Sequence, residues 1–522
     1  MTRSVIAAMV MASLSACSLA PHYARPALPV PPSWPVGDAY LRQSEAALPS
    51  VSYRQVFVDS RLQQVIDRAL ANNRDLRVAA ANIEVARAQY RIQRADLFPQ
   101  VDATGRYSFS SGGSGAGSLG TSGTTTGNGG AGTGTGGTGT GTGGTGTGTG
   151  GTVVTSSGSG SRSAFSASVG ATAFEIDLFG RVRSLTGAAL DRYFGTEAAA
   201  RATRLTLVGD VADAWLQLGA DRSLLILAQQ TAAAAQQSVR LTRARLEGGI
   251  SPRTDLTQAQ QILETAQADV AQQTTAVAQD GNLLQLLVGA PIEGALLPAT
   301  VDEALPAVVA LPAGVDSGVL LRRPDVVEAE YQLRAANGEI GAARALLFPR
   351  LSLTGLLGFA SNALSSLFTG GAFNYSVAPT ASYPIFTAGA GRANVAGARA
   401  QRDAALASYE RAIQSAFRET ADALARQGTI NAQLGANRRF AAAAADTLNL
   451  VNARYQGGIE TFLSSLDAQR QLYTAQRTVV GTTLTAASNR VALYRALGGD
   501  AMLDVASDGS GPPRQSRVVD PR

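Results

Sequence analysis

Two kinds of hydrophobic pattern alternate along this chain, and the first is helical. Stretches that lack proline, or that space apolar residues three and four apart, predict five helices at 61–97, 182–247, 253–289, 391–455 and 461–497. At 1.5 Å per residue the longest would extend about 100 Å. The two shorter helices of the first half together match its long helix, so we expect each half to place one long helix beside two stacked short ones.

The second pattern is strict alternation. In Val101–Phe109, apolar or small residues occupy every odd position and polar residues every even one, and residues 163–173, 351–359 and 373–383 repeat this period. Such alternation predicts strands with one apolar and one polar face. The four strands form two hairpins, and each strand has about the length that a tilted strand needs to cross a membrane. Pro379 stands in the fourth strand although it cannot donate a ladder hydrogen bond.

The two halves of the chain repeat each other. Residues 95–99 and 345–349 share the pattern Ala-x-Leu-Phe-Pro at an offset of 250, and residues 248–250 and 457–459 share Gly-Gly-Ile at an offset of 209. Self-similarity of this kind indicates a duplicated architecture. We therefore assign 58–291 to a first structural repeat, 292–318 to a connector and 319–499 to a second structural repeat.

The N-terminus has the pattern of a secretion signal. A short apolar stretch, too short to span a membrane as a helix, is followed by Leu-Ser-Ala-Cys at 14–17. This sequence resembles the bacterial lipobox, in which the Cys becomes the lipidated first residue of the mature chain. We expect a signal peptide at 1–16, an acyl-linked Cys17 and a lipidated, proline-rich linker at 17–57. Ser18, where Asp would favour inner-membrane retention, is compatible with the outer membrane.

Two further segments are not expected to form regular structure. Residues 110–161, between the first two strands, consist mainly of Gly, Thr and Ser and cannot bury apolar surface. We expect them to form a disordered loop that faces the outside of the cell. Residues 500–522 are expected to be a flexible C-terminal tail.

Composition excludes several function classes. The formal net charge of +5 is spread along helices, which argues against a nucleic-acid partner. His22 is the sole His and Cys17 the sole Cys, so the chain offers no Ser-His-Asp or Cys-His arrangement and no His-based metal site. We therefore expect no enzyme, no catalytic residue, no metal and no cofactor beyond the covalent lipid on Cys17.

Four membrane strands cannot seal a pore. The smallest transmembrane barrels need about eight strands, and open sheet edges do not occur in lipid. Copies of the chain must therefore pool their strands around a lumen lined by the polar strand faces, which indicates a conduit rather than a catalyst. A soluble β-sandwich is the alternative, but four strands set between very long helices would make a poor sandwich.

Several motifs together carry a family resemblance. In chain order they are Phe174–Arg181, Arg322–Asp325, Phe348-Pro349, Tyr383–Phe386, Leu466–Arg470 and Leu497–Gly499. In combination they resemble TolC-like outer-membrane factors, and the lipobox places the chain with the efflux lipoprotein, or NodT-like, branch. The chain departs from the family pattern in its Gly/Thr/Ser tract.

The resemblance implies an α+β fold class: a trimeric outer-membrane β-barrel with four strands per chain, continued by a long α-helical coiled-coil periplasmic tunnel and internally duplicated. It implies a homotrimer in outer-membrane lipids, a periplasmic adaptor (membrane fusion) protein and an inner-membrane pump of the resistance-nodulation-division type. The implied function is the exit duct of a tripartite efflux system for drugs or other toxic small molecules. Two alternatives stay open: the outer-membrane duct of a type I protein-secretion system, and a structural coiled-coil envelope lipoprotein.

The resemblance also implies two kinds of site. The turns between the long helices would be adaptor-docking tips, formed by Gly248, Gly249, Ile250, Gly457, Gly458 and Ile459. Independently of the family, their glycines should cap helices at positive φ. Acidic rings narrow the periplasmic entrance in this family, and Asp446 is the candidate for a periplasmic gate, although a solvated surface position explains this residue better. Arg322-Arg323-Pro324-Asp325 is interpreted only as a helix start.

Overall fold

The computed structural model describes residues 19–31, 33–35, 52–110, 162–309 and 317–499. Cys17, the Gly/Thr/Ser tract beyond Ser110 and the tail at 500–522 lie outside the described residues. The chain divides into a helical unit and a sheet unit. Among the helices that the structure describes, none is long and apolar enough to cross a membrane.

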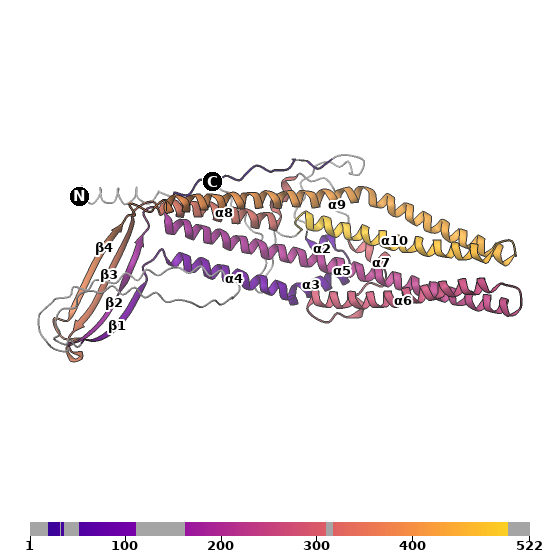
Figure 1. The fold of residues 1–522 in the computed structure, drawn as a ribbon, viewed down its shortest axis with the longest axis horizontal. Helices are drawn as coiled ribbons and strands as arrows, with labels where there is room; N and C mark the ends of the chain where they lie inside the picture. Colours follow the sequence, from indigo (N-terminus) through magenta and orange to yellow (C-terminus); the bar gives the residue numbers. More distant parts are fainter. Residues whose placement is uncertain (1–18, 32, 36–51, 111–161, 310–316, 500–522) are drawn as a thin grey trace, which may run out of the picture. The chain divides into compact units, whose positions relative to one another are not determined.

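The helical unit consists of long helices that run side by side (Figure 1). Its helices are α2 (Tyr53–Val56), α3 (Ser60–Asn72), α4 (Arg74–Ala95), α5 (Arg181–Glu247), α6 (Arg253–Val288), α7 (Val301–Ala304), α8 (Pro324–Ala345), α9 (Ala390–Gln456) and α10 (Phe462–Ala496), with short 3-10 turns at Gly294–Leu296, Leu305–Ala307 and Ser317–Arg322. Four of the five predicted helices are confirmed to within one residue at each end.

The fifth prediction, a single helix over 61–97, is wrong because Asn73 breaks it into α3 and α4. Asn73 has an extended ψ of 137°, and its Oδ1 accepts a hydrogen bond from the Leu76 backbone N–H at 3.1 Å. Its Nδ2 donates to the Leu287 carbonyl at 2.8 Å. Asparagine competes with the helix for backbone hydrogen bonds, so it starts a new helix at α4 rather than continuing α3.

The helices reproduce the sequence repeat in length as well as in order. Helices α4 and α8 have 22 residues each and start 250 residues apart. Helices α5 and α9 have 67 residues each and start 209 residues apart. No insertion separates the repeats within these helices, so each position in one repeat has a defined equivalent in the other.

The main core lies where the short helices of the first repeat meet. Trp215 of α5 is fully buried there and donates its indole N–H to the Leu296 carbonyl at 2.9 Å. Phe57 and Tyr494 pack edge to face, with ring centroids 5.3 Å apart. Buried aromatic rings contribute much apolar area, so this cluster ties α10 of the second repeat to elements of the first.

The sheet unit holds four strands in the order β1-β2-β3-β4. They are β1 (Val101–Ser110), β2 (Arg162–Ile176), β3 (Arg350–Ser361) and β4 (Phe373–Ser382), with a 3-10 turn at Leu364–Ser366. The β1–β2 and β2–β3 pairs are antiparallel. The four predicted strands are confirmed. Within one chain β4 is the last strand of the sheet, where a proline disturbs fewer ladder hydrogen bonds than it would in a central strand.

The alternation in the second strand does not continue to its end. The β2–β3 register shifts between Ala171 and Phe174, and Ala173 has a φ of +52°. This is the signature of a β-bulge, in which one extra residue bends the strand and changes which face the following side chains occupy. Phe174 and Ile176 therefore lie on a face that simple alternation from Val169 would not assign to them.

Candidate functional site

The two predicted tips have almost the same geometry. After α5, Gly249 has a φ of +70°, and the Ile250 N–H donates to the Arg245 carbonyl at 2.8 Å. After α9, Gly458 has a φ of +75°, and the Ile459 N–H donates to the Arg454 carbonyl at 2.9 Å. Each glycine takes the left-handed conformation that ends a helix while satisfying its last carbonyls. The predicted cap at positive φ is confirmed for Gly249 and Gly458, whereas Gly248 and Gly457, with φ of −78° and −76°, do not need the left-handed conformation.

The tips expose one large apolar side chain each. Ile250 is 71% exposed and Ile459 is 70% exposed, at equivalent positions of the two hairpins. Each hairpin thus ends in a large apolar side chain that the described residues leave uncovered. A single exposed apolar side chain is normal at a protein surface, so the informative feature is its recurrence at the equivalent position of both turns.

The two hairpins are joined just behind the tips. The Arg245 Nη1 donates to the Tyr455 hydroxyl at 3.1 Å, and its guanidinium lies 5.1 Å from the centre of the Tyr455 ring. Val239, Ala259, Phe462 and Leu466 form a buried apolar cluster beside this contact. The hairpin α5–α6 is thus held to the hairpin α9–α10 at the level where each one turns.

Asp446, the gate candidate, is an exposed residue of α9 ten positions before the helix ends at Gln456. In the part of the chain that the structure describes, it has no ion-pair partner. Asn452, six residues further along α9, does have a partner: its Oδ1 accepts a hydrogen bond from the Ser465 hydroxyl of α10 at 2.5 Å. The structure of one chain does not bring Asp446 together with the tip residues.

The segment that follows Cys17 is bound to the helical unit. The carbonyls of Leu19 and Pro21 accept hydrogen bonds from Arg344 at 3.0 Å and Asn337 at 2.8 Å, both of α8. Ala20 lies so close to Gly341 that a Cβ there would approach within 2.8 Å. Trp34 stacks on a phenylalanine of α9 at 4.9 Å. The segment is therefore held along α8 and α9 almost from its first described residue.

Glu330 is the polar centre of that contact. It is 4% exposed and accepts two hydrogen bonds from Arg25, at 3.0 and 2.7 Å, and one from Arg334 at 2.7 Å. Burial alone would raise the pKa of Glu330, but the hydrogen bonds from the two arginines outweigh it and leave the pKa below its usual value. Glu330 thus remains a carboxylate that fixes the N-terminal segment to α8.

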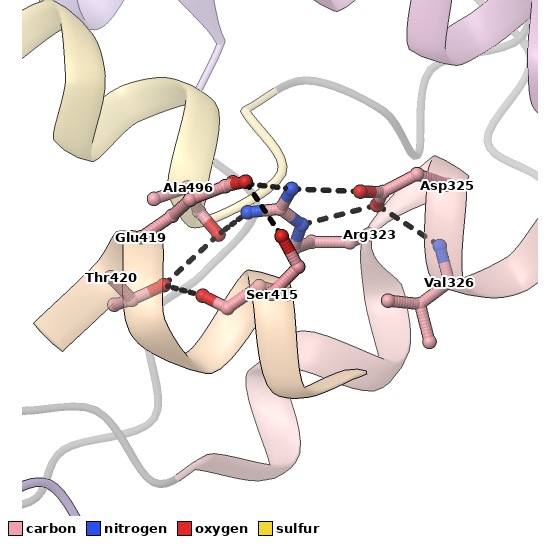
Figure 2. A network of polar contacts seen from close by, with 8 residues as sticks. Arg323, Asp325, Val326, Ser415, Glu419, Thr420 and Ala496 are labelled. Carbon is pink, nitrogen blue, oxygen red and sulfur yellow. Dashed lines mark hydrogen bonds and ion pairs between the residues drawn. The ribbon is translucent and has the colours of Figure 1, made fainter. Parts of the chain in front are cut away.

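A second network was not foreseen from the sequence. Pro324 is the first residue of α8 and Asp325 lies in its first turn, so the predicted helix start is confirmed. Arg323, however, is only 8% exposed and joins three elements (Figure 2). It donates to Asp325 at 2.8 and 3.1 Å, to Glu419 of α9 at 2.9 Å and to the Ala496 carbonyl of α10 at 3.2 Å.

The first repeat contains the equivalent contact. Asn73 precedes Arg323 by 250 residues and Leu287 precedes Ala496 by 209, and Asn73 donates to the Leu287 carbonyl as Arg323 does to that of Ala496. In each repeat, the residue just before α4 or α8 donates a hydrogen bond to a backbone carbonyl at the C-terminal end of α6 or α10. The two repeat offsets were the sequence signal that could have located both residues. We call these contacts the junction contacts.

A neighbouring arginine connects the repeats to each other. Arg495 of α10 forms ion pairs with Asp210 at 2.7 Å and Asp213 at 3.2 Å, both of α5. Asp213, Arg495, Asp422 and Arg426 line an open polar cavity of about 760 Å³. Within the described ranges, no group of acidic, His or Cys side chains could hold a metal ion.

Known proteins are similar to this chain over most of its length. The family described as Outer membrane efflux protein matches residues 65–290 and 317–499. The toluene efflux pump outer membrane protein TtgC of Pseudomonas putida is 40% identical over 96% of this chain and 96% of its own. The cation efflux system protein CusC of Escherichia coli is 36% identical over 94% of this chain and 98% of its own.

Solved structures agree with the fold. A crystal structure of CusC matches with a TM-score of 0.76 at 34% identity, over 92% of this chain and 100% of that one. The open state of the Neisseria gonorrhoeae MtrE outer membrane channel matches with a TM-score of 0.75 at 32% identity, over 93% and 99%. These matches confirm the predicted resemblance, the four-stranded sheet with long helices, and a transport rather than an enzymatic role. This chain therefore belongs to the outer membrane efflux protein family and is an outer-membrane efflux channel.

Proposed function

We propose that the chain is the exit duct of a tripartite system that removes drugs or other toxic small molecules from the cell. One observation carries the proposal: end-to-end similarity to efflux channels, combined with two exposed hairpin tips. TtgC is named for toluene and CusC for cations. A duct of this kind takes its cargo from the pump that feeds it, so the same fold serves chemically different substrates.

The duct acts as a homotrimer in this proposal. The sheet of one chain has two edge strands, β1 and β4, whose outer backbone groups have no partner within it. In hydrocarbon such groups cost several kcal/mol each. Three chains that join β4 of one to β1 of the next would close one barrel and leave no edge.

The tips dock a periplasmic adaptor, and through it an inner-membrane pump of the resistance-nodulation-division type. Gly248, Gly249 and Ile250, with Gly457, Gly458 and Ile459, supply two equivalent apolar ends per chain. Equivalent tips on both hairpins suit a partner that contacts every hairpin of a ring in the same way. Asp446, exposed on α9, would contribute an acidic ring that favours cations at the entrance.

Cys17 is the anchor of the mature chain after removal of residues 1–16. Residue 19 is already hydrogen-bonded to α8, so a single residue, Ser18, separates the lipidated Cys from a fixed point of the helical unit. Acyl chains on Cys17 would therefore hold the end of α8 near the inner leaflet of the outer membrane. One acyl group alone binds membranes weakly, and several acyl chains together with a barrel give stable anchoring.

The test is complementation in a host that lacks its own efflux channel and carries a periplasmic adaptor and a resistance-nodulation-division pump. The expected result is restored extrusion of a fluorescent dye. The double variant Ile250→Asp/Ile459→Asp should lose extrusion and adaptor binding, whereas Ile226→Asp, at a 41% exposed position of α5, should retain both. Secretion of a protein without dye extrusion would point instead to a type I secretion duct. Neither activity, with an altered spacing of the envelope, would point to a structural lipoprotein.

A further inference from the structure

The helical unit carries exposed arginines at the end where its helices connect to the strands. Helices α4 and α8 end there, and α5 and α9 begin there (Figure 1). Arg91 and Arg94 of α4 and Arg392 and Arg399 of α9 are all exposed, and among the described residues none of the four has an ion-pair partner. We call these four residues the arginine band. Four cations without counter-charges raise the question of which anion they meet.

The first turns of the two long helices run against the usual charge pattern. A helix N-terminus carries partial positive charge, so acidic side chains are favoured there and cations are not. Helix α5 nevertheless begins with Arg181 and Arg183, α9 has Arg392, and neither first turn contains an acidic residue. Arg392 is the equivalent of Arg183, 209 residues further on. Both repeats therefore keep a cation at a position that the helix itself disfavours.

Only the first repeat supplies a counter-charge for this cation. Asp177 accepts a hydrogen bond from the Arg183 side chain at 3.4 Å. The residue equivalent to Asp177 in the second repeat is Phe386, so Arg392 has no corresponding acid. The anion that balances Arg392 must come from outside the described part of the chain.

The N-terminal segment shows which side of the helices faces outward. Asn337, Gly341 and Arg344 of α8 hold residues 19–21, next to Cys17, the expected point of lipid attachment. Acyl chains are excluded from water, so they cannot lie in a water-filled duct. The face of α8 that binds this segment is therefore the outward face.

The arginines of α4 lie on the equivalent face. Helix α4 packs against α5 as α8 packs against α9. Arg91 and Arg94 stand 250 residues before Gly341 and Arg344, which contact the N-terminal segment. The repeat thus places Arg91 and Arg94 on the outward side of α4.

The arginines of α9 also face outward. Trp34 of the N-terminal segment stacks on Phe417 of α9, with ring centroids 4.9 Å apart. Arg399 precedes Phe417 by 18 residues and Arg392 by 25, which are about five and about seven helical turns. Whole numbers of turns return to the same side of a helix, so both arginines share the outward side with Phe417.

The opposite face pairs its charges at this level. Glu339 stands two residues from both Asn337 and Gly341, so it points about 160° away from each of them. It forms an ion pair with Arg192 of α5. Here the inward face is neutralised within the chain, whereas the outward face carries the arginine band.

Large apolar side chains are exposed in the segments that join these helix ends to the strands. Ile385 is 91% and Phe386 87% exposed, and Leu347 and Phe348 are each 39% exposed. Arginines beside exposed apolar and aromatic side chains are typical of a protein surface at a membrane interface. There the apolar groups enter the acyl region and the guanidiniums stay at the level of the headgroups.

We propose that the arginine band binds the headgroups of anionic phospholipids, with phosphatidylglycerol as the type, in the periplasm-facing leaflet of the outer membrane. A guanidinium can donate two hydrogen bonds to one phosphate, and basic residues beside an anionic membrane surface strengthen binding to it. The inference rests on the proposed trimer with its lipidated Cys17, and it names the lipid class that this assembly prefers.

The test uses the full-length, lipidated protein, purified in mild detergent and depleted of bound lipid. Dioleoyl phosphatidylglycerol and dioleoyl phosphatidylcholine have the same acyl chains and one phosphate each, but only the first has a net charge. In competition against a fluorescent phosphatidylglycerol, the anionic lipid should bind about tenfold more tightly. This preference should weaken when the salt concentration rises from about 50 to about 500 mM.

Two sets of substitutions identify the site. The band variant combines Arg91→Gln, Arg94→Gln, Arg392→Gln and Arg399→Gln, and it should bind the two lipids alike. The matched control removes four exposed arginines nearer the tips, Arg240→Gln, Arg243→Gln, Arg253→Gln and Arg439→Gln, and should keep the preference. If the band variant does not assemble, its α4 pair and its α9 pair are tested separately, and each should weaken the preference.

The outcomes separate the lipid site from the assembly. Loss of the preference in the band variant alone supports the site. Equal binding of both lipids by the wild type, or an equal loss in the control, overturns it. Displacement of the labelled lipid by inorganic phosphate as readily as by phosphatidylglycerol would identify a site for free phosphate and would also overturn it. Size in detergent reports the trimer independently: a monomeric wild type overturns the proposed trimer whatever its lipid preference, and a trimer without that preference overturns only the lipid site.

Discussion

The two hairpins, α5–α6 and α9–α10, share their lengths and tips but differ in the polar groups between their helices. In the second hairpin, Asn437 donates to Thr482 at 2.9 Å and Asn489 donates to the Ala423 carbonyl at 3.0 Å. At the equivalent positions the first hairpin has Ala228, Gln273, Asp280 and Ala214.

In the first hairpin these groups are poorly satisfied. The Gln273 Oε1 and one carboxylate oxygen of Asp280 are buried and have no hydrogen-bond partner among the described residues. Asp280 also faces Asp221, where the second hairpin has Ile430. Unsatisfied buried polar groups cost stability. At these positions the first hairpin is therefore less well satisfied than the second, whereas at Thr483 of α10 the order is reversed, because the equivalent Thr274 of α6 donates to the Val270 carbonyl.

The largest expected loss of stability is at Trp215, a tryptophan in the buried core of the first repeat whose equivalent in the second repeat is Leu424. Trp215→Ala should lower the free energy of unfolding by about 3–5 kcal/mol, because it removes a fully buried ring and its hydrogen bond. The equivalent Leu424→Ala should cost less, about 2–3 kcal/mol. Trimer dissociation on heating in detergent measures both, and equal losses would contradict the assigned difference.

The junction contacts give the next largest effect. Arg323→Ala removes the guanidinium shared by two carboxylates and the Ala496 carbonyl, which then keep one donor each, from Val326, Ser415 and Thr420, and should cost about 2–3 kcal/mol. Asn73→Ala removes a cap and one donor and should cost about 1–2 kcal/mol. The exposed neighbour Arg322→Ala should change stability by less than about 0.5 kcal/mol. A cost for Arg322→Ala as large as for Arg323→Ala would show that the network is not the cause.

Equivalent substitutions at the two tips should cost the same stability, so this prediction tests how similar the two hairpins are. Gly249→Ala and Gly458→Ala each force a Cβ into the left-handed region and should each cost about 1 kcal/mol. A Cβ at either glycine would meet nothing within 4 Å, so only the backbone conformation matters. Gly248→Ala, at a φ of −78°, should be close to neutral. Thermal dissociation and adaptor binding measure the set, and unequal losses at the two tips would break the equivalence.

The smallest expected effect is a dependence on pH. Burial and the adjacent Asp221 raise the pKa of Asp280 to about 7. The folded protein thus keeps a proton that the unfolded chain releases near pH 4, so this group makes stability fall as the pH rises from about 4 to about 7, with no further change above. Asp280→Asn should flatten that part of the slope, and Asn489→Asp should add a slope in the second hairpin.

The readout is the dissociation temperature between pH 4 and 8, compared with wild type. Asp191, whose pKa burial raises to about 6, acts in the same direction and remains in every variant. The effect of Asp280 is therefore read from the difference between the wild-type and variant slopes of dissociation temperature against pH. Asp446→Asn, on the exposed face of α9, is the matched control. A slope unchanged by Asp280→Asn would exclude the acid pair as its source.

Much of the fold could be predicted because its signals are long. A stretch of 67 residues without proline fixes a helix to within a residue, and four alternating segments fix the strands. The break at Asn73 was missed because a single polar residue hardly changes a helical period. The bulge at Ala173 was missed because one extra residue leaves the alternation of apolar and polar residues intact on either side and only changes which face each side chain occupies after it. Arg323 was recognised as part of a helix start, but its partners lie about 96 and 173 residues away and are brought to it only by packing.

The equal lengths of α5 and α9 limit which insertions and deletions the protein can tolerate. One codon inserted within α5 would turn every later side chain of that helix by about 100° and move its end by about 1.5 Å relative to α9. The seam with α6 would then present its polar residues to the wrong neighbours. Insertions or deletions in one long helix should therefore survive only when the other long helix changes by the same number of residues, whereas the segments that connect the helices are free of that constraint.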